Sequence, residues 1–429
     1  MALQPKSKDS TLEVTEETVH VTKLVHGGQG LGTLVDGRTV FVWNALPGET
    51  VTASVIKYKK NYAEAIAVDV QEPSTDRVTP RDDAYLSTSP WQILSFKAEN
   101  TYKQAILTEA MERENVRYKS GVGWYAGNDE WHYRNKMEYS FFGDDDGLHM
   151  ALFRRGTHTK QILDGSSIAR PELDETARAI TAVLDDSTIR ASQLKSLVVR
   201  CNQASEVVAS LFVKDEKLVV SSAIAETCKG GVVYYSTPKS PASVMTKKLV
   251  SFGDTTLSDT IAGRDIIYDV HSFFQVNLPV FERALDSIAK HAKGADRLVD
   301  MYAGVGTIGI SVGATVFVEI DARNVAMAKQ NIGDSGAEVV QASTETALDF
   351  ITPEATILFD PPRAGLHAKI VDRILEATPK KIIYLSCNPS TQARDIARLQ
   401  DTYTITSIEG FNFFPKTPHI ESLAVLELR

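Results

Sequence analysis

Short hydrophobic runs separated by polar turns fill the first part of the chain. From Thr18 to about Val70, β-rich stretches alternate with the turn signals GGQGLG, VDGR and LPGE. About five strands in roughly fifty residues are typical of a small closed barrel of the OB-fold kind. We therefore predict a β-barrel domain over residues 14–72, preceded by a loose polar tail over residues 1–17.

The hydrophobic pattern then changes to a helical period. Residues 96–117 place Tyr102, Ile106 and Ala110 on one face, which predicts an amphipathic helix. The sequence becomes strand-rich again up to residue 255. We predict a central, β-rich domain over residues 93–255.

From about residue 260, apolar strands alternate with helical stretches. This rhythm is typical of a doubly wound parallel sheet. We therefore predict an α/β domain with a Rossmann-like sheet over residues 256–429. In such sheets, ligands bind beyond the carboxyl ends of the strands.

The composition excludes several classes of protein. The chain has 429 residues, of which 43% are hydrophobic, and no apolar run approaches the roughly 18 residues of a membrane span. The N-terminus lacks the apolar core of a secretory signal, so we expect a cytoplasmic protein without a membrane partner. Its three cysteines form no CxxC pair, which excludes a disulfide scaffold and a four-cysteine metal site. The net charge of −9 still permits a local RNA-binding stripe.

A glycine loop follows the first strand of the α/β domain. The sequence RLVDMYAGVGTIGI carries Gly304-x-Gly306-x-x-Gly309 after Asp300, and the next strand ends at Glu319. Such glycines let a nucleotide approach the backbone, and the strand-end acid receives ribose hydroxyls. Dinucleotide enzymes share this pattern. The short spacing between Gly309 and Glu319 disfavours a nicotinamide dehydrogenase.

Two later strands end in reactive residues. Asp360-Pro361-Pro362 is typical of methyltransferases that act on planar bases, and Arg363 replaces the aromatic residue of the amino-group methylating enzymes. Cys387 follows the next strand, within Ser-Cys-Asn-Pro. Free cysteines are most often small buried hydrophobes. The polar neighbours favour a nucleophile here.

A basic, aromatic stretch closes the predicted barrel. It contains Lys57, Lys59, Lys60 and Tyr62, which offer cations for phosphate and rings for stacking on single-stranded RNA. A solvated hairpin tip explains the same residues equally well.

Taken together, these motifs resemble the RNA uridine-C5 methyltransferase family, which makes 5-methyluridine in ribosomal and transfer RNA. The ordered phrases HGGQGLG, YRNKMEYSF, SFFQVN, DMYAGVGTIG, FDPPRAGL, LSCNPST and TPHIE carry the resemblance through most of the chain. It implies an N-terminal TRAM RNA-binding barrel and a catalytic domain that uses S-adenosyl-L-methionine.

The resemblance also implies roles for individual residues. Cys387 corresponds to the nucleophile that adds to uracil C6, and Glu421 to the base that removes the C5 proton. The implied cofactor-binding residues are Gln275, Tyr302, Gly304, Gly306, Glu319 and Asp360. RNA contacts are expected from Arg363, Lys57, Lys59, Lys60, Tyr62, Arg134 and Lys136.

One departure concerns an iron–sulfur cluster. Many rRNA-directed members hold such a cluster with four cysteines, but this chain has Asp82, Ser87, Ser89 or Pro90, and Ser166 near those places. We predict no cluster and no other metal site.

The substrate stays open between alternatives. The TRAM-like barrel favours 23S rRNA over the T-loop uridine of tRNA, although TRAM-bearing tRNA enzymes also occur. A non-catalytic RNA-binding protein is disfavoured by the intact Cys387, Glu421, Asp360 and Gln275. We expect a monomer.

Overall fold

The computed structural model describes residues 15–429, so most of the predicted tail lies outside the described residues. The chain forms two compact units. The first runs to Thr79 and takes in Ile93–Ser95, and the second comprises Pro80–Gln92 and Phe96–Arg429.

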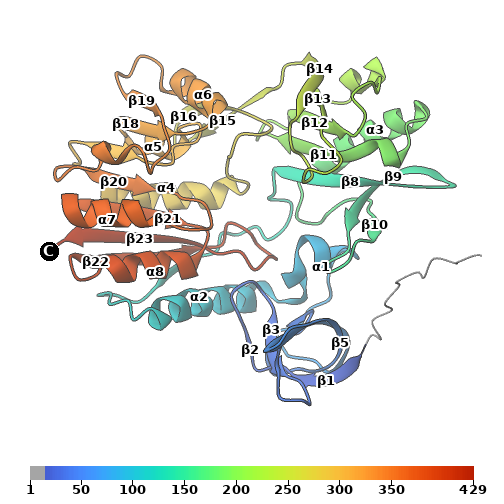
Figure 1. Ribbon diagram of the computed structural model, residues 1–429, viewed down its shortest axis with the longest axis horizontal. Helices are drawn as coiled ribbons and strands as arrows, with labels where there is room; N and C mark the ends of the chain where they lie inside the picture. The colour runs from blue at the N-terminus through green and yellow to red at the C-terminus, as the bar shows by residue number, and fades with distance from the viewer. Residues whose placement is uncertain (1–14) are drawn as a thin grey trace, which may run out of the picture. The chain divides into compact units, whose positions relative to one another are not determined.

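The first unit is a single curled β-sheet (Figure 1). In its described part the strand order is β1-β5-β6-β4-β3-β2. The sheet has one strand more than predicted, since the two-residue strand β2 is too short to recognise in the sequence. The strands are β1 (Glu16–His20), β2 (Lys23–Leu24), β3 (Gly30–Thr33), β4 (Thr39–Trp43), β5 (Thr50–Tyr58) and β6 (Tyr62–Glu72). Gly30 and Gly32 allow neighbouring strands to approach closely where the sheet curls. A Cβ at Gly30 would collide with Val21, and one at Gly32 would collide with Val19.

The second unit contains a seven-stranded sheet with helix α3 (Pro171–Asp186) packed on it. Its order is β10-β9-β8-β11-β12-β13-β14. The strands are β8 (Lys136–Asp144), β9 (Gly147–Phe153), β10 (Lys160–Ile162), β11 (Leu194–Cys201), β12 (Val207–Val213), β13 (Gly230–Tyr235) and β14 (Lys247–Gly253). The short helix α1 (Tyr85–Thr88) precedes this sheet in the chain.

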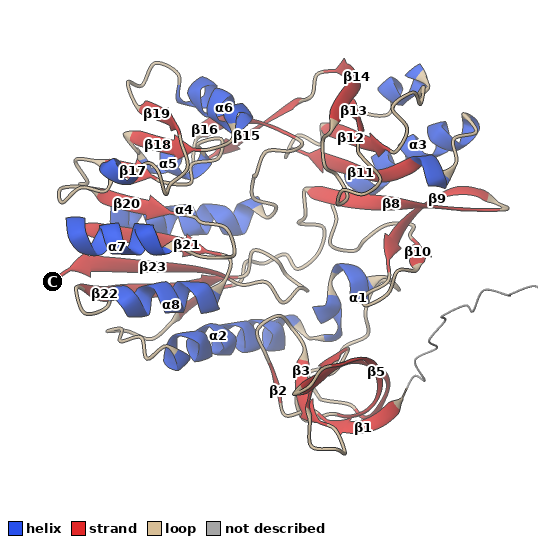
Figure 2. Ribbon diagram, viewed as in Figure 1, coloured by secondary structure: helices blue, strands red, loops and turns tan. Residues whose placement is uncertain are grey.

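The same unit contains an eight-stranded sheet covered by helices (Figure 2). Its order is β19-β18-β17-β20-β21-β23-β22-β7, parallel from β19 to β21, with β23 antiparallel to its neighbours. The strands are β7 (Gly123–Tyr125), β17 (Leu298–Asp300), β18 (Val316–Glu319), β19 (Glu338–Gln341), β20 (Thr356–Phe359), β21 (Lys381–Ser386), β22 (Tyr403–Phe411) and β23 (Glu421–Leu428). The helices are α4 (Leu278–Ala292), α5 (Thr307–Val312), α6 (Ala322–Ile332), α7 (Ala368–Ala377) and α8 (Pro389–Leu399).

Helix α2 (Phe96–Arg113) ends four residues before the predicted end. Asn115 adopts a positive φ of 53°, which a continuing helix does not allow. The helix packs against α8, and β7 joins the edge of the eight-stranded sheet. The C-terminal layer therefore includes residues from before position 256, and the domain limits given above stay a prediction.

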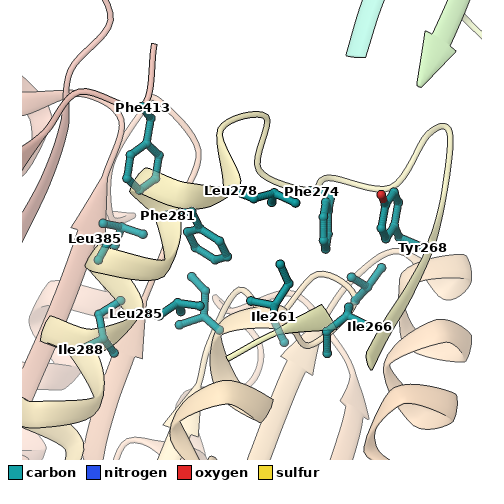
Figure 3. Packing of buried hydrophobic residues seen from close by; sticks show 14 of the residues in the cluster. Ile261, Ile266, Tyr268, Phe274, Leu278, Phe281, Leu285, Ile288, Leu385 and Phe413 are labelled. Carbon is teal, nitrogen blue, oxygen red and sulfur yellow. The ribbon is translucent and has the colours of Figure 1, made fainter. Parts of the chain in front are cut away.

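A hydrophobic core fixes the segment that leads into α4 (Figure 3). The hairpin of β15 (Thr256–Ile261) and β16 (Arg264–Asp269) packs against α4. The rings of Tyr268 and Phe274 stack with their centroids 3.9 Å apart. This packing anchors the SFFQVN segment at both ends. None of the helices in residues 15–429 has the length and apolarity that crossing a lipid bilayer requires.

Candidate active site

A cavity of about 670 Å³ opens where the parallel strands end. Residues that follow or end β17, β18, β20 and β21 line it, together with the segment before β23. It brings together these predicted residues: Tyr302, Gly304, Glu319, Asp360, Arg363, Cys387 and Glu421. This meeting follows from the fold, because the carboxyl ends of parallel strands share one edge.

The glycine loop shapes one wall of the cavity. The carboxylate of Asp300 is buried and accepts a hydrogen bond from the Gly309 backbone N–H at 3.0 Å. Gly304 has a φ of 56°, and a Cβ there would meet no atom within 4 Å, so the glycine leaves space open. Gly306 has a φ of 91° at the N-cap of α5. It shapes the turn and is not among the residues lining the cavity.

Glu319 lines the cavity with a fixed carboxylate. Its Oε2 accepts from the Gly304 N–H at 2.9 Å, and its Oε1 accepts from the Asp321 N–H at 2.7 Å. Each oxygen retains a lone pair for a further donor. Burial raises the pKa of Tyr302, also in the wall, to about 12, so this phenol stays neutral.

Cys387 directly follows β21, and Glu421 begins the adjacent antiparallel strand β23. Ser386 pairs with Ser422, so the next residue on each strand, Cys387 and Glu421, continues the same register. Burial first, and then the negative charges of Glu421 and Asp360, raise the pKa of the half-buried Cys387 thiol to about 12, while Arg363 opposes them. The thiol is therefore protonated at neutral pH.

Two carboxylates in the cavity, Glu421 and Asp360, form no ion pair within residues 15–429, although Arg363 lowers the pKa of Glu421 from a distance. Glu421 is 3% exposed, and its Oε2 has no hydrogen-bond partner among residues 15–429. Burial first, and Asp360 second, raise the pKa of Glu421 well above its usual range. Burial and the neighbouring Asp300 raise the pKa of Asp360 to about 7. This arrangement favours a bound cation and hydroxyl donors.

The polar residues around Cys387 have structural partners. Asn388 caps α8 by accepting from the N–H groups of Ser390 and Thr391, and its Nδ2 donates to the Arg363 carbonyl at 2.9 Å. The Arg363 Nη2 lies 3.3 Å from the His419 Nδ1. Asn388 thus joins the Cys387 strand end to the loop that carries Arg363.

Gln275 adjoins the main cavity through a smaller one of about 30 Å³. Phe273, Tyr302 and Asp360 line both cavities. Phe273 is 65% exposed although it is aromatic, and the sequence interpretation missed it. Its position two residues before Gln275 was the available signal. Phe414, which also lines the main cavity, had no comparable signal.

The other predicted RNA contacts lie outside this cavity. In the first unit, Lys57 pairs with Glu64 at 2.9 Å, and Tyr62 packs edge-on against Phe41, whereas the side chains of Lys59 and Lys60 are exposed.

In the second unit, Arg134 and Lys136 lie at the start of β8. The Arg134 Nε donates to the Lys136 carbonyl at 3.0 Å. Burial, with nearby Arg200, lowers the pKa of Lys136 to about 7. Neither residue lines the main cavity.

Polar groups occupy the region of the expected cluster. The Asp82 Oδ2 accepts from Gln92 Nε2 at 3.0 Å and from the Ser167 N–H at 3.0 Å. Gln92 also donates to Ser89 Oγ at 2.8 Å. No group of three or more His, Cys, Asp or Glu side chains in the described chain is arranged to hold a metal ion. The absence of a cluster stays a prediction.

The model of the tRNA (uracil-5-)-methyltransferase family matches residues 101–355 and 348–429, and that of the TRAM domain matches residues 11–68. This chain belongs to the tRNA (uracil-5-)-methyltransferase family. The resemblance stated from the sequence motifs is thereby confirmed, as are the methyltransferase fold and the TRAM domain.

Full-length relatives agree with this membership. An RNA methyltransferase of Lactobacillus johnsonii is 29% identical over 95% of this chain and 97% of its own. One from Halalkalibacterium halodurans is 28% identical over 99% of this chain and 98% of its own. The solved structure of Pyrococcus abyssi tRNA (uracil-54, C5)-methyltransferase with S-adenosyl-L-homocysteine superposes with a TM-score of 0.77. It is 22% identical and covers 95% of this chain and all of the other.

Proposed function

We propose that this methyltransferase transfers a methyl group from S-adenosyl-L-methionine to C5 of a uridine in RNA, through a covalent bond between Cys387 and uracil C6. One observation carries the proposal. Cys387 and Glu421 continue the register of adjacent strands within a cavity whose other wall presents Glu319.

The residues present fit the cofactor. Glu319 would accept from the ribose hydroxyls, and Tyr302 with the open space at Gly304 would hold the methionine part. Asp360 would lie near the sulfonium, whose positive charge suits a carboxylate without a cationic partner. Gln275, which shares a small cavity with Asp360, would contact this end and the uracil. When bound, S-adenosyl-L-methionine supplies an electrophilic methyl group.

Cys387 makes the uracil reactive. Uracil C5 alone is too weak a nucleophile to accept a sulfonium methyl group. Addition of the Cys387 thiolate to C6 breaks the C5–C6 double bond and places the electron pair on C5 and O4. After methyl transfer, Glu421 accepts the proton from C5, and the returning electron pair expels the sulfur from C6. Arg363, which opposes the rise in the Cys387 pKa, favours the thiolate.

The RNA we propose is 23S rRNA. The TRAM domain supports this choice, with Lys57, Lys59, Lys60 and Tyr62 as contacts for an unpaired segment. Arg134, just before β8, would add a cation, and Lys136 at the start of β8 would add one in its protonated form. A tRNA T-loop uridine is the second candidate, because the structural relative from Pyrococcus abyssi modifies tRNA uridine 54. The target base must leave its stack to reach C6.

Methyl transfer to defined RNAs tests the proposal. The enzyme is incubated with labelled S-adenosyl-L-methionine and with unmodified 23S rRNA or tRNA, and the nucleosides are separated by mass spectrometry. We expect 5-methyluridine in 23S rRNA. 5-Methyluridine in tRNA alone would select the second candidate. Label in neither RNA, with both bound, would contradict methylation.

A further inference from the structure

A second cavity of about 660 Å³ borders the same chain segment as the active site. Phe273 lines the first cavity, whereas Asn277 and Pro279 line the second. The opposite wall of the second cavity contains Trp131, Tyr133 and Asn135, which precede β8. Of these six residues, Phe273 alone touches the cavity that holds Cys387.

Three polar atoms on this second cavity lack partners. Asn135 and Asn277 are each 3% exposed. The Asn135 Oδ1, the Asn277 Nδ2 and the Trp131 Nε1 are buried without a hydrogen-bond partner in the described chain. Asn277 occupies the N-cap of α4, but its side chain makes no capping bond. Buried polar atoms without partners are rare and costly, so a ligand that pairs with these three would remove that cost.

Neighbouring contacts hold the wall in place. The Asn135 Nδ2 donates to the Gln275 carbonyl at 3.1 Å, and the Tyr133 hydroxyl donates to the Pro415 carbonyl at 2.9 Å. The Trp131 ring contacts the Arg81 guanidinium, whose carbon lies 4.1 Å from the ring centroid. A site that is already ordered loses little conformational entropy when it binds.

The donor set fits a nucleobase and not a phosphate. The free atoms are one acceptor, Asn135 Oδ1, and two donors, Asn277 Nδ2 and Trp131 Nε1. A phosphate accepts only and would leave Asn135 Oδ1 unpaired, whereas the edge of a base offers donors and acceptors together. Asp129 and Glu130 also line the cavity; Asp129 repels phosphate, whereas Glu130 pairs with Lys416 at 2.6 Å. The Arg170 guanidinium is engaged by the Asn202 carbonyl and Glu172.

We propose that this cavity binds a second, unstacked base of the same RNA, one that neighbours the target uridine. The inference rests on the proposed function. Asn277 lies four positions after Phe273, a distance of at most about 14 Å along the chain, so nearby nucleotides of one strand reach both cavities. Asn135 also contacts the Gln275 backbone, so the base site is joined to the segment beside the methylated uracil. The second site would select the sequence context of the target.

Two substitutions and abasic RNAs test the proposal. Asn277→Ala removes one free donor, and Trp131→Phe removes another while keeping the aromatic ring. The probe is a hairpin, from 23S rRNA or a tRNA T-arm, chosen as the one that the protein binds more tightly. Nucleotides on either side of the target are made abasic one at a time. We expect each variant to raise the KM for RNA about tenfold with kcat nearly unchanged.

The abasic series decides whether a base is bound. When the nucleotide at one position is abasic, the KM of the unmodified protein for that RNA should rise by the same tenfold. On that RNA, neither variant should show a further rise in KM. If the substitutions raise the KM equally on all RNAs, or do not raise it at all, the cavity holds only solvent and the proposal is overturned. Trp124→Phe is the matched control, because the Trp124 indole already donates to Asn100 Oδ1 at 3.0 Å. It should leave the KM for RNA unchanged.

Equilibrium binding separates this inference from the proposed function. The Cys387→Ala protein is titrated with the same hairpins, so that no methyl transfer is needed. If the unmodified protein methylates none of the RNAs, the proposed function is contradicted, while the binding series with Cys387→Ala still tests the base site. Base-dependent loss of affinity in Asn277→Ala supports the site, and base-independent binding overturns it.

Discussion

The two cavities of the second unit are nearly equal in volume but differ in their buried polar groups, which are titratable in the first and are amides and an indole in the second. The first contains Cys387, Glu421 and Asp360, whose pKa values burial raises. The second presents the amides of Asn135 and Asn277 and the Trp131 indole, none of which titrates near neutral pH. A cavity that performs proton and covalent chemistry needs groups of the first kind. Recognition of a neutral base needs only fixed donors and acceptors.

The largest effect should come from Cys387. We expect Cys387→Ala to lower methyl transfer at least about 10⁴-fold, because no other cysteine within residues 15–429 lines the cavity to add to uracil C6. Cys201 is the control: burial raises its pKa to about 12 as well, but it is fully buried in β11. Cys201→Ala should keep its activity per folded molecule. Comparable losses in both variants, measured by label incorporation, would contradict the assignment.

Glu421→Gln should separate the two halves of the reaction. Cys387 can still add to C6, but the C5 proton has no acceptor, so turnover should fall about 10²- to 10⁴-fold. A covalent RNA–protein complex should accumulate and be visible by denaturing electrophoresis. If turnover fell without any complex, Glu421 would be acting before the addition.

The kcat/KM for RNA should rise with pH near neutrality. Burial raises the pKa values of Cys387 and Glu421, and both must lose a proton to act. Below the thiol pKa of about 12, the thiolate fraction grows tenfold per pH unit. We therefore expect kcat/KM for RNA to rise up to about a hundredfold over two pH units near neutrality. A kcat/KM that falls with increasing pH in this range would contradict the prediction.

Glu319→Gln should give the smallest effect. Its carboxylate is fixed by the N–H groups of Gly304 and Asp321, and an amide presents only one acceptor oxygen. We expect the Kd for S-adenosyl-L-methionine to rise about tenfold, measured by calorimetry, with RNA affinity unchanged. Equal weakening of RNA binding would indicate that the substitution disturbs the whole cavity.

The sequence was most informative about site residues that follow the repeated parallel strands of the α/β sheet. Asp360 and Cys387 follow successive parallel strands, so their meeting at one edge could be expected. Glu421 begins an antiparallel strand and reaches the same edge because β23 runs in the opposite direction. Its place became an expectation through the family resemblance.

The second cavity could not be predicted in this way. It depends on the packing of the residues before β8 against the start of α4, which are far apart in the chain. The sequence also does not reveal that Asn277 leaves its helix uncapped or that Asn135 uses only its Nδ2. Phe273 was missed for a related reason, since an exposed aromatic residue looks the same in sequence as a buried one.

Covalent capture tests the central claim most directly. The protein is incubated with S-adenosyl-L-methionine and RNA containing 5-fluorouridine, digested and examined by mass spectrometry. Fluorine cannot leave C5 as a cation, so elimination stops and the adduct persists. We predict a methylated fluorouridine adduct on Cys387 and none on Cys201 or Cys228. An adduct on another residue, or methylation that proceeds without any adduct, would contradict the mechanism.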